Sequence, residues 1–160
     1  MSDVADEPPA ERDMPPGRVV ALDLGERRIG VASSDDRRRV AVPSEVLERT
    51  PDRPALHRRI AQLVADLEGT VVVVGVPLSL DGAVGPAARR ILAEVAELQD
   101  RLQVPVVTCD ERFSTSEAHS SLRATGMDER SRRGVVDAVA AAVILQRWLD
   151  GRSSREDVAS

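Results

Sequence analysis

Three acidic positions stand out in this sequence, because each one interrupts or directly follows a run of apolar residues. Asp23 lies in Val-Val-Ala-Leu-Asp-Leu-Gly, and the pair Asp110 and Glu111 follows a second apolar run. Asp137 lies in Val-Val-Asp-Ala-Val-Ala-Ala-Ala-Val-Ile-Leu, a segment that is otherwise apolar throughout. A buried carboxylate is costly unless it is paired or bound to a metal. These positions are therefore the first candidates for chemistry.

Carboxylates from separate segments suit a divalent-metal centre if the fold brings them together. Mg²⁺ prefers oxygen ligands and keeps several waters and substrate phosphates in its shell. Two such ions about 3.5–4 Å apart stabilise the attacking and leaving oxygens of a phosphoryl displacement. The residue types thus predict a phosphodiester-cleaving centre that uses Mg²⁺ or Mn²⁺, with two ions.

Each acid also has a purely structural interpretation. Asp23 could cap the turn after its strand, and the stretch from Asp110 to Arg112 could be a solvated charged turn. The side chains of His57 and His119 are expected at the surface of helices, and Cys109 is expected to be a small core residue.

The elements that would position these acids alternate along the chain in the manner of an α/β domain. Three strands joined by short turns come first, and helices and strands alternate after them, which predicts a mixed five-stranded sheet flanked by helices. The expected strands are 18–24, 29–34, 40–47, 71–74 and 104–109. The expected helices are 50–67, 86–102, a short one from the capping box at Ser114 to about 126, and 130–150.

Composition narrows the class of protein further. The chain has 160 residues, which is the size of one domain, and its single cysteine argues for a reducing cytoplasm. No apolar run is long enough for a membrane span, and residues 1–16 are predicted to be a disordered acidic leader. We expect the domain at 17–150 and a flexible tail at 151–160.

The net charge of −5 does not exclude a nucleic-acid partner. The leader holds five acids and one base, a net −4, so the rest of the chain carries about −1. If three acids bind metal, the remaining residues sum to about +2, and all 22 basic residues are arginine. Arginine grips phosphate through two parallel hydrogen bonds.

Four short motifs occur in order between residues 18 and 150. They are Asp23-Leu-Gly-Glu-Arg-Arg-Ile-Gly-Val-Ala, Gly75-Val-Pro-Leu-Ser-Leu-Asp-Gly, Asp110-Glu-Arg-Phe-Ser-Thr and Asp137-Ala-Val-Ala-Ala-Ala-Val-Ile-Leu. Together they resemble the YqgF family, also called RuvX, of Holliday-junction-resolvase-like proteins that are regarded as nucleases for pre-16S rRNA.

The resemblance implies a ribonuclease-H-like single domain and a divalent-metal nuclease. It implies that Asp23, Glu111 and Asp137 are the catalytic metal ligands, with Asp23 bridging the ions and Asp110 as the alternative to Glu111. The substrate would be structured RNA or branched DNA, cut by a monomer or a homodimer. Candidate substrate-binding residues are Arg28, Arg112, Ser114, Thr115, Arg132 and Arg133.

Two other classes of protein compete with the nuclease. The actin and sugar-kinase class also opens with an Asp-x-Gly turn, but it holds ATP between two such domains and this chain supplies one. A non-catalytic nucleic-acid-binding module is the second rival, and acids in its groove would repel phosphate. A Holliday-junction resolvase remains the alternative within the nuclease class itself.

Overall fold

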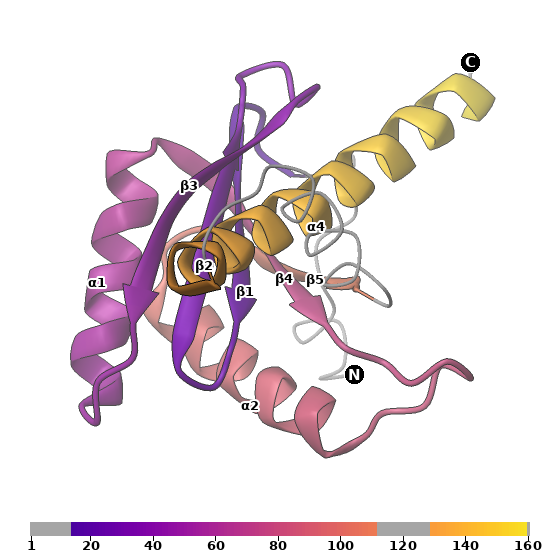
Figure 1. Ribbon diagram of the computed structural model, residues 1–160. Coiled ribbons are helices and arrows are strands. Elements are labelled where there is room, and N and C mark those ends of the chain that lie inside the picture. The colour runs from indigo at the N-terminus through magenta and orange to yellow at the C-terminus, as the bar shows by residue number, and fades with distance from the viewer. Residues whose placement is uncertain (1–13, 112–128, 160) are drawn as a thin grey trace, which may run out of the picture.

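The computed structural model describes residues 14–111 and 129–159, and within the second segment it describes the side chains of residues 136–152. The described strands and helices form a five-stranded sheet with helices on both faces (Figure 1). In chain order they are β1 (Arg18–Leu24), β2 (Arg28–Ser34), β3 (Ala41–Glu48), α1 (Arg53–Asp66), β4 (Gly69–Val76), α2 (Pro86–Arg101), β5 (Val106–Asp110) and α4 (Glu129–Ala159).

The sheet is mixed, as the sequence predicts. Its strand order is β3-β2-β1-β4-β5. The first three strands form an antiparallel meander, while β4 and β5 run parallel to β1. The carboxyl ends of β1, β4 and β5 therefore meet at one edge of the sheet, which is where ligands bind in folds of this kind.

Side chains alternate between two apolar layers. Val20 and Leu22 of β1 pack with α1 and α2, whereas Val19 and Ala21 pack with α4 on the other face. This alternation is the two-residue period of a strand. Figure 1 shows α4 crossing one face of the sheet, with α1 and α2 against the opposite face. The face on which a side chain lies thus follows from its position along the strand.

Two helix boundaries differ from the sequence prediction. The helix expected to begin at residue 50 begins later, because the N-cap of α1 is Asp52, whose carboxylate accepts a hydrogen bond from Ala55 N. Aspartate at this position satisfies one of the unpaired N–H groups of the first turn. Helix α4 continues to Ala159, beyond the predicted end at Asp150.

The prediction of a surface position for His57 is wrong. Its side chain is fully buried between α1 and α2, where it contacts Glu94. His119 and the predicted short helix that starts at Ser114 lie outside the described residues. None of the described helices is sufficiently long and apolar to span a membrane.

Candidate active site

Asp23 lies on the face of the sheet that α4 covers. It follows Val19 and Ala21 at two-residue spacing, and both of those side chains pack with α4. Its partner in the antiparallel pairing of β1 and β2 is Gly30. The position of Asp23 near the end of β1 and beneath α4 brings a carboxylate to the interface between strand and helix.

Gly30 allows α4 to approach the sheet at Asp137. A Cβ atom at Gly30 would lie only 1.8 Å from the carbonyl oxygen of Asp137. The backbone of α4 therefore rests directly on β2, beside the strand position that pairs with Asp23. The small neighbours Ala138 and Ala141 are also buried, so this part of the helix packs closely. Gly30 thus brings the second carboxylate next to the first.

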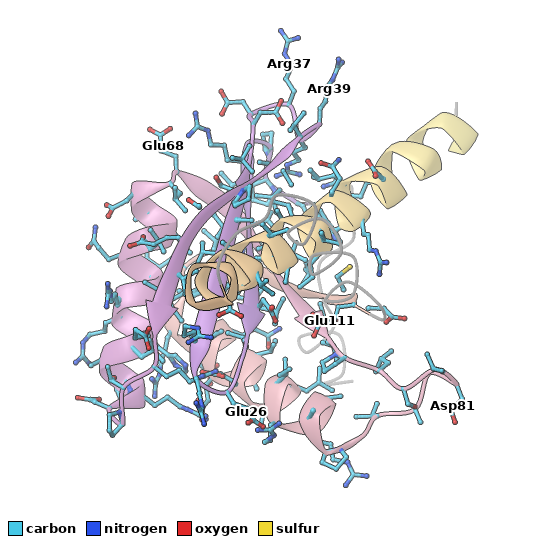
Figure 2. All side chains as sticks on the ribbon, viewed as in Figure 1. Glu26, Arg37, Arg39, Glu68, Asp81 and Glu111 are labelled. Carbon is cyan, nitrogen blue, oxygen red and sulfur yellow. The ribbon has the colours of Figure 1, made fainter. Side chains whose placement is uncertain are left out.

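The same alternation distinguishes Glu111 from Asp110. Val107 and Cys109 of β5 pack on the α4 face, and Glu111 continues that series, whereas Asp110 is exposed. The backbone N–H of Glu111 donates to Val76 O at 3.1 Å, which holds it beside the end of β4. Figure 2 shows Glu111 at this end of β4. The geometry therefore brings Glu111 to the α4 face.

A second glycine leaves space for the Glu111 carboxylate. A Cβ atom at Gly75 would lie 2.8 Å from Oε2 of Glu111 and 2.6 Å from Cδ1 of Ile144. Any larger residue at the end of β4 would therefore compete with this side chain for the space under α4.

Burial and nearby negative charges raise the pKa values of Asp23 and Glu111. Burial, together with the nearby charge of Asp137, raises the pKa of Asp23 to about 6. Burial, together with the charges of Asp23 and Asp110, raises the pKa of Glu111 to about 8. Such shifts are typical of carboxylates that are gathered in a functional site.

Arg28 forms an ion pair with Asp137, one of these three acids. Its Nε donates to Oδ2 of Asp137 at 2.7 Å, and that hydrogen bond raises the pKa of the guanidinium. The sequence predicts a phosphate contact for Arg28. In the structure its Nε instead holds the Asp137 carboxylate, and a phosphate contact stays a prediction.

The donor set fits a hard divalent cation, because it consists of carboxylate oxygens from three elements. Among the described residues, no three His, Cys, Asp or Glu side chains lie close enough to hold a metal ion as they stand. Oδ2 of Asp137 is already engaged by Arg28. Metal binding would therefore require the carboxylates to move inward and Asp137 to share or leave its arginine.

The raised pKa values predict a specific dependence of stability on pH. A carboxyl group whose pKa is higher in the folded chain stabilises it below the unfolded pKa, and that stability is lost as pH rises through the folded pKa. For Asp23 the loss runs from about 4 to about 6, and for Glu111 from about 4.5 to about 8. We expect the melting temperature of the metal-free chain to fall between pH 5.5 and 8.5, as measured by differential scanning calorimetry.

Added Mg²⁺ should raise the melting temperature more at pH 8.5 than at pH 5.5, because it binds deprotonated carboxylates. The double variant Asp23→Asn with Glu111→Gln is the control and should lose most of both effects. A melting temperature that is flat or rises over this pH range in the metal-free wild type would contradict the assignment.

The remaining predicted site residues are not brought to this cluster by any described contact. Arg112, Ser114 and Thr115 lie outside the described residues. Arg132 and Arg133 belong to the first turns of α4, before Asp137, and their side chains are not described. Their proposed contacts with phosphate stay predictions.

The sequence alone indicated no roles for Gly30 and Gly75. The one signal it offered is that each glycine lies within one of the four family motifs. Their contribution is the absence of a side chain, which becomes visible only when α4 and Glu111 are in place.

Comparison with protein families and known proteins identifies relatives of this chain. The family model described as "RuvX: Holliday junction resolvase" matches residues 17–151. A protein of Anaeromyxobacter sp. (strain Fw109-5), named "Putative pre-16S rRNA nuclease", is 49% identical over 135 residues, covering 84% of this chain and 98% of its own length. A protein of the same name from Roseiflexus sp. (strain RS-1) is 42% identical over 137 residues, covering 86% of this chain and 96% of its own.

A solved structure, T. thermophilus RuvC in complex with a Holliday junction substrate, superimposes with a TM-score of 0.52. It shares 17% sequence identity, and the match covers 86% of this chain and 96% of RuvC. This likeness confirms the ribonuclease-H-like fold. The family match spans most of the chain, and the chain therefore belongs to the RuvX family.

Proposed function

We propose that this chain is a divalent-metal-dependent nuclease that processes the 5′ end of pre-16S rRNA. The observation that carries the proposal is that three acids, Asp23, Glu111 and Asp137, come from β1, the end of β5 and α4 and lie near enough for the charge of Asp137 to act on Asp23 and that of Asp23 to act on Glu111. Their burial and mutual repulsion raise the pKa values of Asp23 and Glu111 to about 6 and about 8. Such a group of carboxylates is suited to binding cations and unsuited to binding phosphate directly.

The three acids have distinct roles in this proposal. Asp23 lies on β1, between β2 and β4 in the centre of the sheet, and would be the central ligand of the divalent ions, Mg²⁺ or Mn²⁺. Glu111, beside the end of β4, and Asp137, over Gly30 of β2, would be the other two ligands. Two divalent ions supply Lewis-acid stabilisation of the attacking and leaving oxygens in phosphodiester hydrolysis.

Arg28 orients Asp137 before a metal arrives. Its Nε holds one carboxylate oxygen at 2.7 Å, which leaves the other oxygen available to a cation. If the Asp137 carboxylate turned toward a bound cation, the Arg28 guanidinium would become available to contact a substrate phosphate. Arg112, Arg132 and Arg133, with Ser114 and Thr115, are the further proposed phosphate contacts.

The substrate is proposed from the relatives. The two relatives above carry the name of a pre-16S rRNA nuclease, and their sequences match this chain over nearly their whole length. A branched-DNA resolvase is the second candidate, because the matching family model is described as a Holliday junction resolvase. Symmetric cutting of a junction needs two active sites, so that candidate implies a homodimer.

We also propose a cytoplasmic location, because the chain has one cysteine and its proposed substrate is RNA.

The experiment compares three substrates with the purified full chain. They are a transcript with the 5′ precursor of 16S rRNA, the same transcript starting at the mature 5′ end, and a four-way DNA junction. We expect Mg²⁺ or Mn²⁺ to support cleavage of the precursor, EDTA to abolish it, and the mature transcript to remain intact.

The other outcomes separate the rival functions. Cleavage of the junction in preference to the precursor would favour the resolvase. Salt-dependent RNA binding that EDTA leaves unchanged, without cleavage of any substrate, would favour a non-catalytic binding module and overturn the nuclease.

A further inference from the structure

Arg49, in the short link between β3 and α1, joins the candidate active site to the opposite layer of helices. Its Nε donates to the carbonyl oxygen of Gly25 at 2.6 Å, and its backbone N–H donates to Arg27 O at 2.9 Å. Its two terminal nitrogens donate to the two carboxylate oxygens of Glu94 in α2, at 3.1 and 2.7 Å. One side chain thus ties the turn between β1 and β2 to α2.

The anchor for Arg49 is a buried polar network. The Glu94 side chain is 3% exposed, and its Oε2 accepts a hydrogen bond from Nε2 of the buried His57 at 2.8 Å. Nδ1 of that histidine faces Arg101 Nη1 at 3.0 Å. Because arginine only donates, the neutral ring accepts at Nδ1 and carries its proton on Nε2. Each nitrogen of the ring therefore has a partner.

Glu94 carries its charge despite its burial. Burial acts to raise the pKa of Glu94, but hydrogen bonds from Arg49 and His57, with the charges of Arg49 and Arg53, outweigh it and lower the pKa. A charged, bidentate pair of this kind is both strong and directional. It provides Arg49 with a rigid support.

The turn that Arg49 holds carries Asp23 and Arg28, the arginine that pairs with Asp137. It begins at Asp23, whose carbonyl accepts from Gly25 N at 3.0 Å, and it ends at Arg28, which is paired with Asp137. The turn is tight, since a Cβ at Gly25 would lie 2.6 Å from Arg28 O. A shift of this turn would therefore move both Asp23 and the partner of Asp137.

We propose that Arg49 is a positioning residue for the metal centre, which it serves by locking the β1–β2 turn to Glu94. This inference rests on the proposed nuclease function. Partners of metal ligands in other proteins contribute 10–100-fold to metal affinity or activity. Arg49 acts one step further out, through the backbone of the ligand-bearing turn.

The test compares Arg49→Gln with Arg53→Gln. Arg53 is a matched control, because its Nε also faces Glu94, at 4.0 Å, and its Nη1 pairs with Glu97. None of its described contacts is with residues 23–28. Three quantities are measured on folded protein: Mn²⁺ affinity by electron paramagnetic resonance, kcat and KM for precursor RNA, and amide hydrogen exchange of residues 23–30.

We expect Arg49→Gln to weaken Mn²⁺ binding and lower kcat by about 10-fold or more, while KM changes by less than about twofold. Exchange in residues 23–30 should accelerate. Arg53→Gln should match the wild type in all three measurements. Glu94→Gln, which keeps the size of the side chain, should reproduce the effects of Arg49→Gln. The double variant Arg49→Gln with Glu94→Gln should lose no more Mn²⁺ affinity or kcat than either single variant, because the two residues act as one unit.

Two results would overturn the positioning role. One is unchanged hydrogen exchange of the turn in Arg49→Gln. The other is faster exchange with Mn²⁺ affinity and kcat equal to those of Arg53→Gln. A wild-type chain that neither binds Mn²⁺ nor cleaves RNA would instead count against the proposed nuclease, and the exchange data would still decide whether Arg49 holds the turn.

Discussion

Asp23→Asn is expected to lower the rate of metal-dependent RNA cleavage by about 1,000-fold or more, while it raises the melting temperature of the metal-free chain at pH 8. The loss follows from the removal of the proposed metal ligand at the centre of the sheet. Metal ions supply several kcal/mol of transition-state stabilisation, and each 1.4 kcal/mol is tenfold in rate.

The gain in stability has a separate cause. At pH 8 the folded wild type holds an ionised Asp23 that is buried and repelled by Asp137 and Glu111. Asparagine has nearly the same shape and no charge, so it removes both penalties. Lower activity with higher stability is the signature of a residue retained for function. A structural turn cap at Asp23 predicts the opposite change in stability.

The measurements are single-turnover cleavage and thermal melting, each with and without Mg²⁺. Asp110→Asn is the matched control, because it removes a neighbouring carboxylate that is exposed and lies off the α4 face. We expect it to retain cleavage, whereas Glu111→Gln should lose it. Wild-type cleavage rates in Asp23→Asn would rule out the proposed site.

Gly30→Ala should be the most destabilising single methyl addition among the described glycines. The new Cβ would lie 1.8 Å from a backbone oxygen of α4, and no side-chain rotation relieves a contact with backbone. Overpacking typically costs 1–3 kcal/mol, so we expect about 3 kcal/mol, or a melting temperature lower by about 10 °C. Because the displaced helix carries Asp137, cleavage should fall as well.

The same helix contains the control for this experiment. Gly151 lies in α4 with open space where a Cβ would be placed, so Gly151→Ala should be neutral or slightly stabilising. Both variants are compared by urea denaturation and by precursor cleavage. If Gly30→Ala unfolds at the same urea concentration as the wild type, the close packing of α4 on β2 is wrong.

Hydrophobic periodicity was sufficient to predict most of the fold. The apolar run at 71–74 predicted a strand, and β4 is that strand, extended at both ends. Strand β1 has the predicted bounds. These elements are local patterns of apolar residues, which a single sequence displays directly.

Contacts between residues that are distant in the sequence could not be predicted from hydrophobic periodicity. The choice between Asp110 and Glu111 depends on the face to which β5 turns each residue, and one residue of register reverses it. The roles of Arg49 and His57 depend on Glu94, which is 45 and 37 positions away in the chain. Arginine and histidine are common at surfaces, so their residue types alone favoured the wrong environment for His57.

The strand order also has a consequence for the growing chain on the ribosome. The β1–β3 meander needs only contacts between neighbours in sequence, and it is available once residue 48 has been made. The carboxylates come from residues 23, 111 and 137, and the apolar layer of Val19, Ala21, Val71 and Val73 has no cover until α4 is synthesised. A nascent chain that lacks α4 therefore presents an uncovered apolar sheet face, and it lacks one of the three proposed metal ligands. The proposed cleavage of RNA would begin only after α4 has been translated.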